Sequence, residues 1–268
     1  MKYYIRFLLC AVLCGIVFFG STSTQNNIIC VSDIIISLGF GVAECIPRSI
    51  IDITYYFTPV LIFQILYGTY IYRHFCSASV YYFSRTENKI RWYIKQTIEL
   101  FTFSLLYVIL LLGASMASAS IFNEVIFSKN DIVLGFYFLV LYVFFVFVTT
   151  NFINIFAILF SSGTAFVIVN AVQILSMALF VMADTFFAEN EITKKNLYIL
   201  LNPIAHLIIR VHTSKNEEMS SLYSTIGKGF DFNISIFVYF TFALISLILG
   251  CIIVKLKDVT GSNEQEEF

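Results

Sequence analysis

Apolar residues gather in six stretches, separated by segments that hold most of the charged side chains. A helix needs about 20 apolar residues to cross the roughly 30 Å hydrocarbon core of a bilayer. The pattern therefore predicts six transmembrane helices, each satisfying its own backbone hydrogen bonds. The expected spans are 7–19, 53–72, 101–121, 132–160, 165–183 and 234–254.

The first stretch fits two interpretations. Lys2 and Arg6 precede the apolar run 7–19, as in a signal peptide cleaved near 21–24, and equally as in a short first span that is retained. Retention is favoured because the rest of the chain is rich in apolar spans. Cleavage stays open as the alternative.

Two further apolar segments are too short or too interrupted to be regular spans. Residues 28–43 contain Asp33 and two glycines, and residues 196–211 are broken at Asn202 and Pro203. We expect interfacial or re-entrant helices on the outer face in both places. A seventh span is the alternative for 28–43.

A charged segment, Ser84–Leu100, lies between the second and third spans and holds four of the sixteen Lys and Arg residues. Ser84 and Glu87 have the spacing of a capping box, which predicts a helix start. A charged helix cannot enter hydrocarbon, so we expect it on the cytoplasmic face. It is either a docking element for a soluble partner or a basic helix that only fixes topology. The expected docking residues are Arg73, Arg85, Glu87, Lys89, Arg91, Trp92 and Lys95.

Four amides interrupt the fourth and fifth spans on either side of a predicted tight turn at 161–164. A helical hairpin would set them at similar depth, close enough to bond each other and hold the helices together. A polar lining for a substrate path is the alternative. The four residues are Asn151, Asn154, Asn170 and Gln173.

Composition places the chain among integral membrane proteins. Of 268 residues, 59% are hydrophobic and 12% charged, against about 25% charged in a soluble domain. We expect one all-α transmembrane domain over 1–254, with a disordered acidic tail at 255–268. A net charge of −1 gives no reason to expect a nucleic-acid partner.

Basic residues set the expected orientation. Nine of the sixteen fall in segments that this topology places inside, and seven fall outside. The positive-inside rule then puts both termini in the cytoplasm of a multi-pass cell-membrane protein.

The chain lacks the common catalytic and metal-binding motifs. It has no GxxxxGK[ST], HExxH or GxSxG sequence, and its spans hold no paired carboxylates for proton coupling. We therefore expect no enzyme activity, no metal and no cofactor in this chain. Cys30 and Cys45 fall in the same expected outer loop, and whether they pair is left open.

The segment from Tyr72 to Lys95, YRHFCSASVYYFSRTENKIRWYIK, together with the six spans and the broken Asn202-Pro203 segment, resembles the permease subunit of a type-two ATP-binding-cassette (ABC) exporter. The closest likeness is to small bacterial permeases linked to peptide or bacteriocin export and self-immunity. The likeness covers nearly the whole chain, and it lies in topology more than in invariant letters.

The resemblance implies a partner for the charged segment. It would be a coupling helix that docks on a separate dimer of ABC ATPase subunits, which bind ATP and magnesium. Two permease chains, identical or different, would then move an amphipathic substrate such as a peptide, bacteriocin or lipid-like compound. The alternative is a non-transporting membrane protein that gives bacteriocin immunity or senses a toxin, and an intramembrane enzyme is a third and weaker hypothesis.

Overall fold

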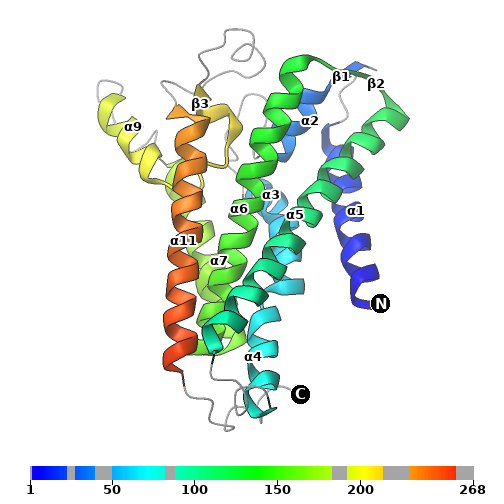
Figure 1. The fold of residues 1–268 in the computed structure, drawn as a ribbon. Coiled ribbons are helices and arrows are strands. Elements are labelled where there is room, and N and C mark those ends of the chain that lie inside the picture. Colours follow the sequence, from blue (N-terminus) through cyan, green and yellow to red (C-terminus); the bar gives the residue numbers. More distant parts are fainter. Residues whose placement is uncertain are drawn as a thin grey trace.

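The computed structural model describes residues 2–22, 28–39, 50–81, 88–182, 192–213 and 230–257, most of them in helices (Figure 1). The helical class expected from the sequence is confirmed. The longer helices are α1 (Lys2–Thr22), α3 (Ile50–Tyr67), α4 (Tyr70–Tyr81), α5 (Lys89–Phe122), α6 (Lys129–Leu159), α7 (Ser162–Val181) and α11 (Phe232–Leu256). The shorter ones are α2 (Val31–Leu38), α9 (Ile192–Leu201) and the 3-10 turn η1 (Ile209–Val211).

Two short parallel strand pairs lie at the same end of the bundle (Figure 1). Strand β1 (Ile28–Cys30) pairs with β2 (Glu124–Ile126), which connects α5 to α6. Strand β3 (His212–Thr213) pairs with β4 (Phe230–Asp231), which leads directly into α11. Each pair therefore fastens an interrupted segment to the end of a long helix.

Four helices in the described part of the chain are long and apolar enough to cross a membrane: α5, α6, α7 and α11. They correspond to the third to sixth expected spans. The first expected span coincides with α1, whose described apolar run, Phe7–Val17, is shorter. The second expected span differs, because it is divided into two helices.

The division falls at Gly68 and Thr69, after which α4 continues to Tyr81. The amide of Gly68 donates to the carbonyl oxygen of Gln64 at 2.6 Å, and a Cβ atom on Gly68 would overlap that oxygen. Glycine is therefore required for this close backbone turn. Predicting a single span over 53–72 was wrong, because one glycine among apolar residues gave little local warning of a break.

The charged segment also differs from the expected separate helix. Helix α5 runs without interruption for 34 residues, about 51 Å at 1.5 Å per residue. No glycine or proline occurs before Gly113, so nothing in the chain ends the helix at the membrane face. Asn88 caps it by accepting from the Arg91 amide at 3.1 Å. The expected cap residues, Ser84 and Glu87, lie outside the described residues.

Helix α6 is the centre of the bundle. It packs against α2, α3, α4, α5, α7 and α11, and 56% of its apolar window is buried, against 22% for α11. Only Phe160 and Ser161 separate it from α7, and the Ser161 hydroxyl caps α7 by accepting from the Thr164 amide. The predicted turn at 161–164 is thus present but tighter than expected.

Small residues bring α1 and α5 close together. The Ser115 hydroxyl donates to the Gly15 carbonyl at 3.0 Å. A Cβ atom on Gly15 would lie 2.7 Å from the Cβ of Ala114. Close approach with an interhelical hydrogen bond stabilises helix pairs in lipid.

The contact between α5 and α11 gives a stability prediction. Gly250 lies against Tyr93, and a Cβ atom there would overlap the Tyr93 hydroxyl. We expect Gly250→Val to displace this ring and to lower the free energy of unfolding by about 2 kcal/mol, as overpacked sites do. Gly113→Val is the matched control, because its Cβ position has no described atom within 4 Å. Thermal unfolding in detergent tests this, and equal midpoints for the two variants would contradict it.

Candidate functional site

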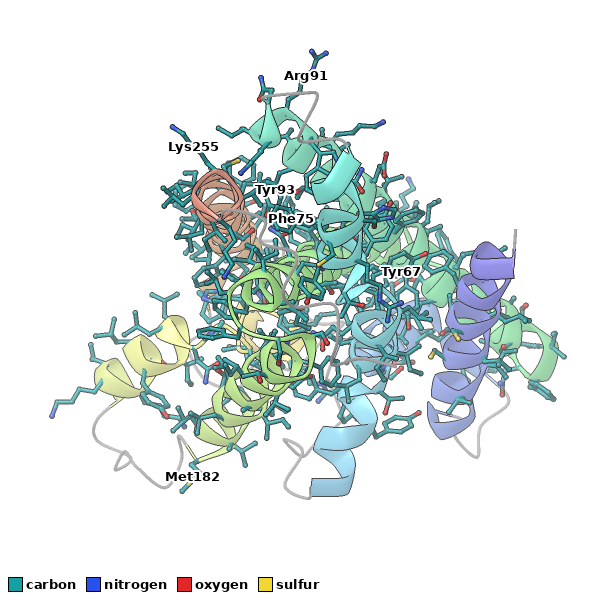
Figure 2. The ribbon with its side chains drawn as sticks, turned by 90° about the horizontal axis from the view of Figure 1, so that it is seen from below. Tyr67, Phe75, Arg91, Tyr93, Met182 and Lys255 are labelled. Carbon is teal, nitrogen blue, oxygen red and sulfur yellow. The ribbon has the colours of Figure 1, made fainter. Side chains whose placement is uncertain are left out.

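Basic residues gather where α4 runs toward its end, α5 begins and α11 ends. Figure 2 shows Arg91 and Lys255 pointing outward at this end, while Tyr93 and Phe75 lie inside the bundle. We call this surface the cationic end. It comprises Arg73, Lys89, Arg91, Lys95, Lys255 and Lys257.

Contacts on both sides hold the first turns of α5 in place. The Lys89 ammonium donates to the Lys257 carbonyl at 3.2 Å, which joins α5 to the end of α11. On the other side, the ring of Trp92 packs against Phe75 of α4 with centroids 6.1 Å apart. About two turns further along α5, Glu99 accepts from the Tyr70 hydroxyl of α4 at 2.9 Å. The cationic end is therefore an assembled surface of three helices.

A groove of about 940 Å³ follows the exposed side of these turns. Arg91 and Lys95 line it together with the exposed side chains of Ile94 and Ile98. Neither Arg91 nor Lys95 has an ion-pair partner among the described residues. The groove therefore combines two basic side chains and the Glu99 carboxylate with apolar surface.

The expected docking residues are brought together in part. Lys89, Arg91, Trp92 and Lys95 share the start of α5, and Arg73 is exposed on the neighbouring α4. Arg85 and Glu87 lie outside the described residues.

Asn154 of α6 binds the break between α3 and α4. Its Oδ1 atom accepts from the backbone amides of Ile71 at 2.7 Å and Tyr72 at 3.2 Å. Its Nδ2 atom donates to the carbonyls of Tyr67 at 3.0 Å and Thr150 at 2.9 Å. The side chain is fully buried, so it replaces water for backbone groups that the break leaves open. We call this the Asn154 clamp.

Asn151, one turn earlier on α6, joins two other helices. It accepts from the Tyr93 hydroxyl of α5 at 3.0 Å and donates to the Ser246 hydroxyl of α11 at 3.1 Å. Ser246 in turn donates to the Ala243 carbonyl at 2.9 Å. All three side chains in this Tyr93–Asn151–Ser246 chain are buried. It connects the core to the first turns of α5.

The two amides of α7 behave differently. Asn170 donates to the Phe166 carbonyl of its own helix at 2.9 Å. Gln173 is 5% exposed, and neither of its amide atoms has a hydrogen-bond partner in the structure. The expectation that the four amides bond to each other was wrong, because each α6 amide faces a different neighbouring helix.

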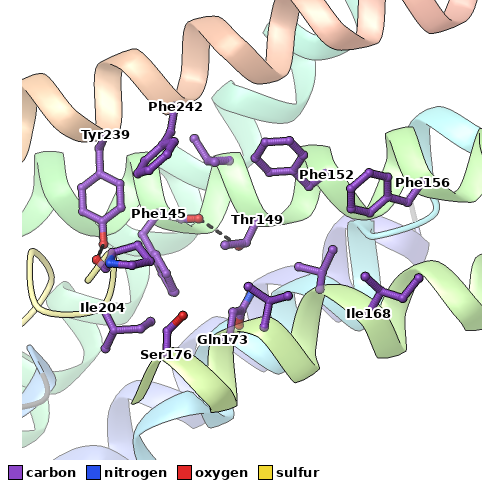
Figure 3. A pocket seen from close by; sticks show the side chains of 14 residues that line it. Phe145, Thr149, Phe152, Phe156, Ile168, Gln173, Ser176, Ile204, Tyr239 and Phe242 are labelled. Carbon is purple, nitrogen blue, oxygen red and sulfur yellow. Dashed lines mark hydrogen bonds between the residues drawn. The ribbon is translucent and has the colours of Figure 1, made fainter. Parts of the chain in front are cut away.

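Gln173 lines an apolar cavity of about 310 Å³ between α6, α7 and α11 (Figure 3). Figure 3 shows Gln173 and Ser176 on the wall formed by α7, across from Phe145 and Thr149 of α6. The lining residues are Phe145, Val148, Thr149, Phe152, Phe156, Ile168, Val169, Val172, Gln173, Ser176, Pro203, Ile204, Tyr239 and Phe242.

A buried pair of histidines fastens the broken segment after α9 to the start of α11. The Nδ1 atom of His206 lies 2.8 Å from the Ser235 hydroxyl, and the Nε2 atom of His212 lies 2.7 Å from the same oxygen. The other ring nitrogens face the carbonyls of Leu200 and Ile208, at 2.8 and 2.9 Å. Spacing along the chain gave no signal for this cluster, since its three side chains meet only through the fold.

Proton counting defines the state of this pair. A carbonyl only accepts, so each ring carries a proton on the nitrogen that faces the backbone. Both nitrogens that face Ser235 are then acceptors in the neutral rings, and Ser235 has one proton to donate. Burial lowers the pKa of His206. Burial also lowers the pKa of His212, to about 4, and outweighs the hydrogen bond to the Ile208 carbonyl, which acts to raise that pKa. Burial therefore favours the neutral rings, and only one of the two contacts with Ser235 is a hydrogen bond in that state.

Metal binding finds no support in the described residues, which contain no group of three or more His, Cys, Asp or Glu side chains arranged around one point. Cys30 is a free cysteine in the structure, and Cys45 lies outside the described residues.

A scan against protein-family models, a search of curated proteins and a search of solved structures each find no match to this chain. Its function is therefore inferred from its own residues and their geometry.

The Asn154 clamp gives a second prediction. Asn154→Leu keeps the side chain similar in size but removes the partners of the Ile71 and Tyr72 amides and of the Tyr67 carbonyl. We expect a loss of about 3 kcal/mol in the free energy of unfolding, because buried backbone groups lose their hydrogen bonds.

Asn170→Leu is the matched control, since that amide bonds only to its own helix backbone. Thermal unfolding in detergent compares the two variants. A loss for Asn170→Leu as large as that for Asn154→Leu would contradict the clamp.

The histidine pair gives a pH prediction. His212 has a pKa of about 4 in the fold and about 6.5 when unfolded. The unfolded chain therefore binds the proton first, and stability should be lost as the pH falls below about 6.5 and level off below about 4. The maximal effect is about 3 kcal/mol at 1.36 kcal/mol per pKa unit.

Thermal midpoints measured from pH 7 to pH 4 test this against His212→Gln, whose amide does not titrate. The variant should show a flatter pH profile than the wild-type chain. Identical profiles would mean that His212 stays in one protonation state over this range.

Proposed function

We propose that this chain is the transmembrane permease subunit of an ATP-driven exporter of the type-two ABC class. It works in the cell membrane with both termini in the cytoplasm, beside a second permease chain. A separate ATPase dimer binds ATP and magnesium, and this chain performs no catalysis itself. The substrate is amphipathic, such as a peptide, a bacteriocin or a lipid-like compound.

The observation that carries this proposal is the exposed start of α5. Arg91 and Lys95 line an open groove without ion-pair partners in the described residues, next to exposed isoleucines. Such a surface suits a partner with acidic and apolar side chains, because charge complementarity steers association and apolar burial stabilises it. A basic helix that only fixes topology at the bilayer surface would not need an open groove beside it.

The same helix supports a transport role. The first turns of α5 are continuous with its membrane-spanning part, so a push on Arg91 and Lys95 displaces a rigid rod of about 51 Å. Two residues after Arg91, the buried Tyr93 hydroxyl is bonded to Asn151 of α6. Movement of the docking surface is therefore passed to the central helix rather than absorbed by a loop.

Charge distribution supports the orientation. The described charged residues at the cationic end are Lys and Arg apart from Glu99, whereas the opposite end mixes both signs. It carries Asp33, Glu124, Asp131 and Asp231 together with Lys129, Lys194, Lys195 and Arg210. Membrane proteins keep positively charged segments in the cytoplasm. The cationic end is thus the cytoplasmic end of the bundle in this proposal.

Charge reversal at the groove tests the docking. We expect the tagged wild-type chain to co-purify an ABC ATPase, identified by mass spectrometry, and the double variant Arg91→Glu/Lys95→Glu to lose at least about 90% of it, because like charges then meet across the contact. Lys129→Glu/Lys194→Glu is the matched control at the opposite end of the bundle and should retain the ATPase.

Two results would contradict the proposal: no ATPase with the wild-type chain, or equal recovery with both double variants. Protection against a bacteriocin in cells that lack any partner ATPase would instead support the non-transporting immunity role.

A further inference from the structure

An acidic part of the chain begins directly beside the cationic end. Helix α11 ends at Leu256, and the next carbonyl, that of Lys257, accepts from the Lys89 ammonium of α5 at 3.2 Å. The chain after Lys257 therefore starts next to the first turn of α5. We call residues 258–268, DVTGSNEQEEF, the acidic segment; they lie outside the described residues. The segment has no Lys, Arg or His, and its carboxylates are Asp258, Glu264, Glu266 and Glu267.

The groove on α5 has two positive charges available for such a segment. Arg91 and Lys95 line it, and neither has an ion-pair partner among the described residues. The Glu99 carboxylate, at the far end of the groove, accepts from the Tyr70 hydroxyl at 2.9 Å. Like charges at i and i+4 on a helix repel each other. A carboxylate bound to Arg91 and Lys95 relieves that repulsion.

We propose that the acidic segment folds back into this groove and pairs with Arg91 and Lys95 when no other protein occupies it. The groove is then an intramolecular binding site, and its occupant is the stretch 264–268 of the same chain. The inference goes beyond the proposed function and rests on it only for its consequence. That consequence is that a docking partner must displace the segment before it reaches the two bases.

The acidic segment is long enough to do this. The groove follows α5 from Asn88 to Glu99, about 17 Å at 1.5 Å per residue. The segment has eleven residues (268 minus 257) and spans up to about 36 Å at about 3.3 Å per residue. Attachment beside the groove gives it an effective concentration on the order of millimolar. Contacts that are weak one by one are therefore sufficient to hold it.

The spacing of the carboxylates matches that of the bases. Residues at i and i+2 of an extended chain point to the same side, about 6.6 Å apart, and residues at i and i+4 of a helix lie about 6 Å apart. Glu264 and Glu266 therefore meet the two bases in turn. The next side chain on that side is Phe268, which reaches the exposed Ile98. The segment thus matches both the charge and the apolar surface of the groove.

Photocross-linking tests the proposal on the purified full chain, with one molecule in each nanodisc of neutral phosphatidylcholine and without any ATPase. Benzoylphenylalanine replaces Ile94, which lines the groove and is 42% exposed. The matched control replaces Ile109, which is 45% exposed on the same helix. Ile109 lies 15 residues (109 minus 94) further into the span, about 22 Å away. Mass spectrometry of the digested chain maps the cross-linked peptides.

We expect the probe at position 94 to cross-link to residues 258–268, and the probe at position 109 to give no such product. The triple variant Glu264→Gln/Glu266→Gln/Glu267→Gln should reduce the product roughly tenfold, because it removes three exposed ion-pairing groups. Asp258→Asn is the matched control within the segment. It should cross-link normally, because Asp258 lies outside the paired stretch 264–268.

A charge exchange separates binding from mere proximity. Arg91→Glu/Lys95→Glu should reduce the product about tenfold. Adding Glu264→Lys/Glu266→Lys to the same chain should restore it, because opposite charges then face each other again. A segment that only collides with the groove because it is attached nearby would cross-link equally in all of these variants.

Equal cross-linking of the wild-type chain and the triple variant overturns the proposal, and so does a charge exchange that fails to restore the product. Loss of the product in nanodiscs rich in phosphatidylglycerol also overturns it and assigns the groove to anionic lipid headgroups. An ABC ATPase recovered with the wild-type chain while no cross-link forms would refute the folding back alone. The expected cross-links without any co-purifying ATPase would refute the exporter role alone.

Discussion

Every backbone polar group inside a bilayer must find a partner within the protein, and the Asn154 clamp shows how this chain meets that constraint where a helix is broken. The turn at Gly68 and Thr69 interrupts the helical ladder, and Asn154 bonds to groups on both sides of it. Without water at this depth, no other solvent replaces those bonds. The clamp therefore fixes where α4 begins, and with it the packing of Phe75 on Trp92 at the cationic end.

The four amides differ in their hydrogen-bond partners. Asn151 and Asn154 use their hydrogen-bonding capacity on neighbouring helices, and Asn170 bonds to its own backbone. Gln173 is equally enclosed but has no partner. Of the four amides, two therefore join neighbouring helices, one bonds to its own helix, and Gln173 has no partner among the described residues. Burial does not distinguish the four amides from one another, but their hydrogen-bond partners do.

Hydropathy was enough to locate the long helices, because burial in lipid requires continuous apolar sequence. The spans over 101–121 and 234–254 fall within α5 and α11. Those over 132–160 and 165–183 coincide with α6 and α7 as far as Leu159 and Val181, and all four helices are long and apolar enough to cross. The same signal did not show that α5 starts as early as Lys89, since charge marks the membrane face but does not end a helix. It also missed the break at Gly68, whose flanking backbone groups are bonded by Asn154, 86 residues after Gly68 in the chain (154 minus 68).

The sequence could not predict which residues each side chain contacts, for a related reason. The amides were recognised as unusual residues in a span, but their rotational positions around α6 and α7 depend on packing. The clustering of His206, His212 and Ser235 depends on how the segment after α9 folds back onto α11. Periodicity gives the face of a helix, and only the assembled bundle shows which neighbour that face meets.

One stretch of α6 links the cationic end to the cavity. Asn151 faces α5 and α11, Asn154 faces the break between α3 and α4, and Phe152 lies between them in sequence but lines the cavity against α7. These residues fall within about one helical turn, and a helical turn is rigid compared with the contacts around it. A shift of α5 relative to α11 that moves Asn151 therefore also moves Phe152. If α5 receives force at the cationic end, as proposed, this turn passes the displacement to the cavity through packed side chains rather than through a flexible segment.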